Sequence, residues 1–155
     1  MDFIENRTRD IMQMSLDGLY ERSKAIAANT ANALTPGYKR KEVTFEESLQ
    51  QVIKRENEKE EIKLQNAKLY QKNPSEFLKG QSPEQIAFLN SNTNKDFFID
   101  VEEDMSSGYE IDGNNVNIET EMMDEAQNGM RYNIVASLLS KSYQELNDII
   151  RGQNS

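Results

Sequence analysis

Residues 25–41, "AIAANTANALTPGYKRK", decide how this chain folds. They end an alanine-rich helix in which Asn29, Thr30 and Asn32 stand among small side chains. Small residues let the backbone of another helix approach closely, and an asparagine in such a contact can fix the register by hydrogen bonding. We therefore expect this stretch to pack against other helices, mostly those of neighbouring subunits. The alternative is that the asparagines form a solvent-facing stripe.

The helix is predicted to run from about residue 8 to residue 34 and to stop at a turn. A residue that precedes proline is pushed out of the helical conformation, which makes Thr35 a natural stop. Pro36 and Gly37 fit the two central positions of a type II turn, the second of which needs a positive φ. The three cations at 39–41 follow on an exposed, extended segment. Solvation is the simplest role for them, and contact with an acidic neighbour is the alternative.

Two long helices are predicted from apolar residues that recur at alternating spacings of four and three. The seam of the N-terminal helix consists of Met12, Leu16, Leu19, Ser23, Ile26, Thr30 and Ala33. Asn117 is the expected N-cap of the C-terminal helix, which spans 118 to about 151 and closes at Arg151-Gly152. Its seam consists of Ile118, Met122, Glu125, Gly129, Tyr132, Ala136, Leu139, Tyr143, Leu146 and Ile150. A second apolar stripe beside it consists of Met123, Ala126, Met130, Ile134, Leu138 and Ile149. Two stripes on one helix imply a partner in addition to the N-terminal helix.

The middle of the chain is polar and carries weaker signals. A capping box predicts a short helix with Thr44 as N-cap and Glu47 at the third position. The charged octet 54–61 that follows either extends this helix as an exposed rod or frays. Ser82, followed by proline, should start another short helix that ends near Leu89. Residues 97–101 are predicted to form a short strand that pairs with residues 109–111.

The sequence thus predicts a mainly α fold in which long terminal helices pack as a coiled-coil-like pair. An irregular middle carries short helices and a small β-hairpin. The expected divisions are residues 1–38 for the N-terminal helix and its turn, 39–117 for a variable middle, and 118–155 for the C-terminal helix. Together they make one domain.

Composition excludes several kinds of chemistry. The 155 residues contain no cysteine and no histidine, which removes thiol nucleophiles, imidazole bases and Cys/His zinc sites. A formal net charge of −9 makes the chain a poor binder of nucleic acid. The sequence offers neither a run of apolar residues long enough to span a membrane nor the apolar core of a cleavable signal peptide. We expect no enzyme activity, no metal and no cofactor.

The terminal blocks resemble the flagellar basal-body rod proteins, a branch of the axial rod and hook family. The N-terminal block matches the motif A-x-N-x-A-N-x-x-T-P-G-Y, which this group shares. In this chain the motif consists of Ala27, Asn29, Ala31, Asn32, Thr35, Pro36, Gly37 and Tyr38. The C-terminal block, from Asp112 to Gly152, is similar to one proximal-rod type in particular. Its cues include Met122, Asn128, Arg131 and Tyr132.

The resemblance implies a structural subunit that is exported without a cleaved signal and assembles through its terminal helices into a helical tube. This tube would transmit torque, surround the export channel and lie in the basal body, on the periplasmic side. The implied partners are other copies of the chain, neighbouring rod proteins of the FlgC and FlgF types, the base adapter FliE and the flagellar export gate. The alternatives are another rod protein such as FlgC, or a helical export chaperone or adaptor.

The seams and the resemblance together give the residues expected at subunit contacts. They are Leu19, Ile26, Ala27, Asn29, Ala31, Asn32, Thr35, Pro36, Gly37, Tyr38, Met122, Asn128, Arg131, Tyr132, Leu139, Tyr143, Leu146 and Ile150.

Overall fold

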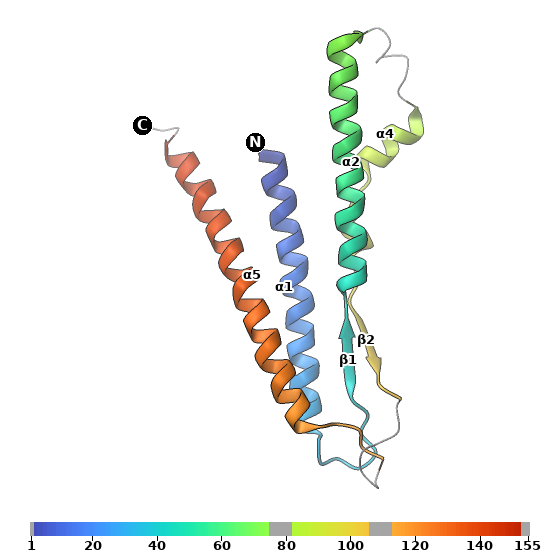
Figure 1. Cartoon of the computed structure of the whole chain (residues 1–155), viewed down its shortest axis with the longest axis vertical. Helices are drawn as coiled ribbons and strands as arrows, with labels where there is room; N and C mark the ends of the chain where they lie inside the picture. Colours follow the sequence, from blue (N-terminus) through green and yellow to red (C-terminus); the bar gives the residue numbers. More distant parts are fainter. Residues whose placement is uncertain (1, 75–81, 106–112, 153–155) are drawn as a thin grey trace. The chain divides into compact units, whose positions relative to one another are not determined.

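The computed structural model describes residues 2–74, 82–105 and 113–152 (Figure 1). In these ranges the chain forms four α-helices, one 3-10 helix and two strands. The helices are α1 (Asp2–Ala31), α2 (Glu46–Lys72), α4 (Pro83–Asn90) and α5 (Ile118–Gly152), with the 3-10 helix η1 at Thr93–Asp96. The strands are β1 (Lys41–Thr44) and β2 (Asp100–Glu103). The chain divides into two compact units, Met1–Phe45 with Ile99–Ser155, and Glu46–Phe98.

The predicted pair of long terminal helices is confirmed. Helices α1 and α5 lie side by side in the first unit and contact each other (Figure 1). Asn117 caps α5 as expected, because its side-chain oxygen accepts a hydrogen bond from the backbone N–H of Thr120 at 3.2 Å. Glu119 and Glu121 then occupy the first turn, where the helix dipole favours acidic side chains.

Helix α1 ends at Ala31, three residues before the predicted stop at Leu34. The Asn32 side chain donates a hydrogen bond to the carbonyl of Ala28 at 2.8 Å, and this local bond competes with continuation of the helix. The turn that follows is of the predicted kind. The Tyr38 N–H donates to the Thr35 carbonyl at 3.2 Å, and Gly37 has a φ of 71°.

The predicted small β element is present, but its pairing differs from the expectation. Strand β2 pairs antiparallel with β1, with Val43 opposite Val101 and Lys41 opposite Glu103. Residues 97–99 lie outside the strand, and the expected partner at 109–111 lies outside the described residues. The expected pair was local in the chain, whereas the observed pair joins segments that are distant in sequence.

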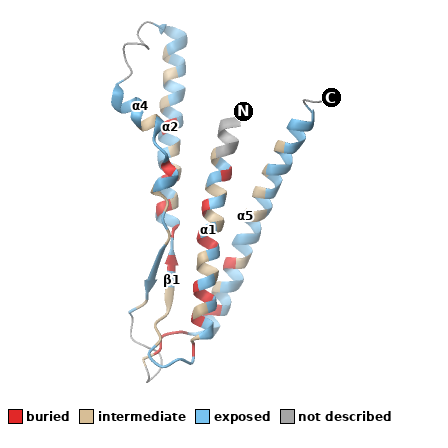
Figure 2. Cartoon of the chain, turned by 180° about the vertical axis from the view of Figure 1, so that it is seen from behind, coloured by how far each residue is buried: buried red, intermediate tan, exposed pale blue. Residues whose placement is uncertain are grey.

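The core of the first unit lies between α1, β1 and α5. The red residues in Figure 2 gather along α1 and β1. Its buried apolar side chains are Met14, Leu19, Ala25, Ile26, Ala33, Val43, Phe45 and Val116. Phe45 lies over Gly18, where an added Cβ would meet three ring atoms at 2.5 to 2.6 Å. Glycine at position 18 is therefore what allows the aromatic ring to pack on the helix backbone.

The second unit is built on α2, and it resolves the two alternatives for the charged octet. The octet continues the helix, which begins at Glu46 and ends at Lys72, just before the proline signal. The capping-box prediction was wrong by one residue, because Thr44 is the last residue of β1. Ser82 caps α4 as predicted, since its hydroxyl accepts from the Gln85 N–H at 3.2 Å.

The segment after α4 returns to α2 and is held by polar contacts. The buried Lys59 ammonium donates to the Ser91 carbonyl and to Glu56. The Glu56 carboxylate also accepts from the hydroxyl of Thr93, and the Ser48 hydroxyl donates to the carbonyl of Phe98 at 2.6 Å. Side chains along one stripe of α2 thus fix the path of residues 91–98.

Candidate functional site

The most polar part of the first unit is also among its most buried parts, and it lies where α1 meets the strand pair. Asn29 is fully buried. Its amide donates to the Lys41 carbonyl at 2.8 Å, and its oxygen accepts from the Lys41 N–H at 2.8 Å and from the Tyr38 hydroxyl at 3.3 Å. The asparagine thus pairs with the backbone of β1 much as a neighbouring strand would.

A carboxylate from α5 completes this cluster. The Glu121 side chain is 0% exposed and accepts from the amide of Asn29 at 3.0 Å. It also accepts from Nε of Arg40 at 2.6 Å, while another nitrogen of the same guanidinium reaches Asp124 at 2.9 Å. A buried carboxylate is stable only when it is paired and hydrogen-bonded, and here the side chains of Asn29 and Arg40 meet that requirement. We call Asn29, Arg40, Glu121 and Asp124 the polar cluster.

The electrostatics of the polar cluster shift two pKa values. Burial alone would lower the pKa of Arg40, but the hydrogen bond to Glu121 and the charges of Glu121, Glu42 and Asp124 raise it above its ordinary value. Burial raises the pKa of the Tyr38 hydroxyl, and the charges of Glu103 and Glu121 add to this rise. The guanidinium is therefore held charged and the phenol is held neutral.

Two asparagines in the loop before α5 close the end of α1. The Asn114 amide donates to the carbonyls of Asn32, Ala33 and Thr35 at 2.9 to 3.1 Å, which satisfies groups that the helix end leaves open. The Asn115 oxygen accepts from the Arg40 N–H at 2.7 Å. This loop therefore couples the end of α1 to the start of α5.

Two of the three cations after the turn, Lys39 and Arg40, are bound through their side chains. Arg40 pairs with the carboxylates of α5, and Lys39 donates to the carbonyl of Gly113 at 2.9 Å. Solvation was the simpler of the two interpretations at 39–41, and for Arg40 it was wrong. The acidic neighbour of the alternative interpretation belongs to the chain itself.

Helix α5 buries polar residues and exposes apolar ones. Its buried residues are Glu121 and Asn128, and the amide of Asn128 donates to the Leu19 carbonyl at 2.8 Å. The opposite side of the helix carries Met123, Met130 and Ile134, each 61% exposed, and Leu138, which is 54% exposed. We call these four residues the free apolar face of α5. They belong to the second stripe seen in the sequence.

The structure places the residues predicted at subunit contacts in three classes. Leu19, Ile26, Asn29 and Asn128 are buried within the chain. Asn32, Tyr38, Leu139 and Leu146 are half-buried. The exposed members are Ala27, Ala31, Thr35, Pro36, Gly37, Met122, Arg131, Tyr132, Tyr143 and Ile150.

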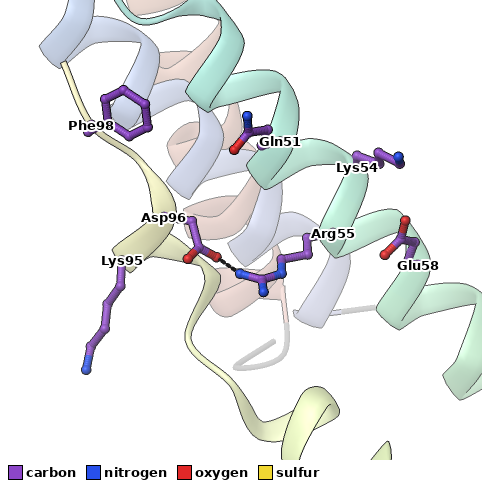
Figure 3. Close-up of a pocket in the computed structure, with 7 residues that line it drawn as sticks. All are labelled: Gln51, Lys54, Arg55, Glu58, Lys95, Asp96 and Phe98. Carbon is purple, nitrogen blue, oxygen red and sulfur yellow. Dashed lines mark hydrogen bonds and ion pairs between the residues drawn. The ribbon is translucent and has the colours of Figure 1, made fainter. Parts of the chain in front are cut away.

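An open polar groove of about 560 Å³ lies in the second unit (Figure 3). Gln51, Lys54, Arg55 and Glu58 of α2 line one wall, and Lys95, Asp96 and Phe98 line the other. Arg55 and Asp96 form an ion pair across it, while Lys54 and Lys95 point away from it. The groove holds no nucleophile paired with a base, so we assign it no chemistry.

Within the described ranges, no group of acidic side chains is arranged to hold a metal ion. No helix in those ranges has both the length and the hydropathy that crossing a membrane requires.

The fold and the free apolar face define a structural protein built on paired terminal helices. No protein-family model matches the chain. Three curated relatives do, and each is a flagellar basal body rod protein FlgB. The relative from Borrelia hermsii is 30% identical over 142 residues, which cover 92% of this chain and 94% of the relative. Those from Borreliella burgdorferi and Buchnera aphidicola are 26% and 24% identical and cover 96% of each relative.

The chain belongs to the FlgB family of flagellar basal body rod proteins, and it is a structural subunit of the rod. The resemblance that the terminal blocks predicted is confirmed.

Proposed function

We propose that the chain enters the rod as a preformed α1–α5 pair and binds neighbouring subunits through the free apolar face of α5. The exposed positions of the axial motif near the turn, including Thr35 and Pro36, form a second contact in this proposal. The assembled subunits form a helical tube that surrounds the export channel and transmits torque. The protein acts as a building element and not as an enzyme.

The observation that carries this proposal is the exposure of the free apolar face. Met123, Met130, Ile134 and Leu138 are all more than half exposed, although they follow one another at helical spacings of seven, four and four. A contiguous apolar stripe of this kind on a monomer usually marks a site of interaction with another protein. Methionine suits such a surface because its flexible thioether adapts to different partners.

Within the described residues, the free apolar face also takes no part in the contact between α5 and α1. The polar cluster and the bond from Asn128 to Leu19 fix α5 against α1 from its other side. A second set of helices can therefore pack on α5 without displacing α1. Identical subunits joined in this way through different surfaces form an open helical lattice.

The partners and the location follow from the family. We propose contacts with other copies of the chain, with rod proteins of the FlgC and FlgF types, with the base adapter FliE and with the export gate. The proposed location is the basal-body rod on the periplasmic side, reached by export without a cleaved signal. The names of the three relatives support the rod itself.

The test places one negative charge on the free apolar face. Ile134→Asp is expected to abolish incorporation of the protein into purified basal bodies, and swimming with it, in a strain that lacks its own copy. Asn133→Asp is the matched control, because it adds the same side chain at the neighbouring exposed position outside the face. Circular dichroism of both purified variants checks that the helices are retained.

Normal assembly of a folded Ile134→Asp variant would overturn the proposed contact. Equal loss of assembly in both variants would also count against it, because the effect would then come from charge on α5 and not from the apolar face.

A further inference from the structure

The two strands form a ladder with two outer edges, and α1 covers one of them. On β1 the backbone N–H and carbonyl of Lys41 bind the side chain of Asn29. The carbonyl of Val43 accepts from Arg22 at 2.8 and 3.1 Å. Side chains of α1 therefore occupy the edge positions at which a further strand would bind to β1.

The register shows which groups form the other edge. The Asp104 N–H donates to the Arg40 carbonyl at 2.7 Å, and Glu42 lies opposite Glu102. In an antiparallel ladder the hydrogen-bonded pairs alternate with pairs whose backbone groups point outward. The backbone groups of Val101 and Glu103 therefore point away from β1. Among the described residues, β1 is the only strand that pairs with β2.

The side chains on this edge are acidic, with one apolar position between them. Asp100, Glu102 and Glu103 are all exposed. Val101 is 52% exposed, although the valine opposite it, Val43, is only 3% exposed. The apolar contact between the two valines is thus covered on the β1 side and open on the outer side of β2.

We infer that the outer edge of β2 binds an extended segment of another protein, which adds a third strand through the backbone of Val101 and Glu103. Strand addition of this kind takes its affinity from backbone hydrogen bonds and its specificity from alternate side chains. Opposite charges on neighbouring strands stabilise the pair, and like charges oppose it. The segment therefore carries lysine or arginine beside Asp100 and Glu102 and an apolar residue beside Val101.

The charge pattern also argues against a second copy of this chain as the occupant. The basic segment that leads into β1, residues 39–41, is already bound by Asn29, Asn115 and Glu121 of its own chain. The occupant is accordingly a different protein with an alternating basic and apolar strand. This inference does not depend on the proposed contact at the free apolar face, because it concerns the strands alone.

The experiment uses the full-length, isotope-labelled protein and a short synthetic peptide of alternating lysine and valine. Nuclear magnetic resonance titration is expected to shift the amide signals of Val101 and Glu103 first. Val101→Pro removes one outward N–H and leaves the β1–β2 bonds in place, so it should weaken binding roughly tenfold. Glu102→Lys reverses one of the recognising charges and is expected to weaken binding to a similar degree.

Two controls separate strand addition from general charge attraction. Glu84→Lys makes the same charge change on α4 and should leave the affinity unchanged. A peptide of the same composition with a methylated backbone keeps the charges but cannot form the ladder, and it should not bind.

Equal binding of the methylated peptide would overturn the inference, as would equal weakening by Glu84→Lys. Failure of the lysine–valine peptide to bind would also overturn it, because the acids would then serve only to keep the edge unpaired. If Val101→Pro fails to fold, the Glu102→Lys variant still decides the outcome.

Discussion

The two terminal helices look alike in sequence pattern, yet within the described residues only α1 buries apolar side chains. Helix α1 buries apolar side chains such as Met14, Leu19 and Ile26. Helix α5 buries Glu121 and Asn128, while apolar residues such as Met123, Met130 and Ile134 are exposed. Figure 2 shows the difference as red along α1 and mostly pale blue along α5. The second apolar stripe of α5, which includes Met130 and Ile134, is therefore not buried by the described part of the chain.

This difference assigns separate tasks to the two helices. Helix α1 is the inner helix, because α5, β1 and the ring of Phe45 all pack on it. Helix α5 is positioned by directional polar bonds, those of Glu121 to Asn29 and of Asn128 to Leu19. In the proposed assembly, the free apolar face contacts neighbouring subunits. Each prediction below alters one side of this comparison.

The largest effect is expected when the polar cluster loses its buried carboxylate. Glu121→Ala removes the shortest ion pair of Arg40, which keeps Asp124 and Glu42, and one of the two acceptors of the Asn29 amide. Removing one partner of a buried ion pair should lower the free energy of unfolding by about 3 kcal/mol. Urea unfolding followed by circular dichroism measures it.

Glu125→Ala is the control for that prediction, because Glu125 is exposed one turn further along α5 and, among the described residues, bonds only the hydroxyl of Ser23. Its expected cost is at most about 0.5 kcal/mol, as for an ordinary surface change. Similar losses in the two variants would show that burial of Glu121 contributes nothing, and that α5 is held by something other than the polar cluster.

The next effect tests the inner helix. Gly18→Ala places a Cβ within 2.5 Å of the Phe45 ring, so the ring must move. Overpacking of this kind should cost about 1–3 kcal/mol in the same unfolding measurement. Phe45→Leu added to Gly18→Ala should recover part of the loss, because the smaller side chain leaves room for the methyl group. A Gly18→Ala variant as stable as the parent chain would contradict the close packing of Phe45 on α1.

The sequence predicted the elements of this fold well because their signals are local. Asn117 and Ser82 each cap a helix by accepting a hydrogen bond from the backbone N–H three residues further along. Gly37 adopts the positive φ that its turn requires. The predicted end of α1 was three residues too late. The groups that end it include Asn114, which is distant in the chain and gives no local signal.

The polar cluster could not be predicted in the same way. Glu121 is the residue before the predicted seam position Met122, and in sequence it reads as an ordinary first-turn acid. Its burial depends on an ion pair with Arg40, which lies 81 residues away in the chain. In the sequence, Arg40 reads as one of three solvated cations. Only the position of Asn29 in the axial motif indicated a polar contact, and this contact was expected with other subunits.

A smaller effect is expected at the other buried polar residue of α5. The amide of Asn128 bonds Leu19, but its side-chain oxygen is buried and has no hydrogen-bond partner among the described residues. Asn128→Leu removes this unsatisfied group together with one hydrogen bond, so the stability should stay within about 1 kcal/mol of the parent.

Asn29→Leu is the matched contrast, because Asn29 makes several hydrogen bonds to Lys41 and Glu121. The same change leaves these buried partners without those bonds. Its loss should exceed that of Asn128→Leu by a wide margin in the same urea series. Equal losses would mean that the two buried asparagines have the same role, which would remove the distinction between the polar cluster and the rest of the helix contact.

The smallest effect concerns pH and again reports on the polar cluster. The pKa of Tyr38 is raised above 10.0, first by burial and then by the charges of Glu103 and Glu121. The folded chain therefore holds this proton more tightly than the unfolded chain does. Its contribution is fully present below pH 10 and is lost as the pH rises through the raised pKa. The hydroxyl also donates to Asn29, a bond that ionisation would remove.

Tyr38→Phe lacks this titration, so the melting temperature of the parent chain should fall further between about pH 8 and pH 11 than that of the variant. Parallel melting curves over that range would show that neither burial nor the charges of Glu103 and Glu121 raise the pKa of the phenol.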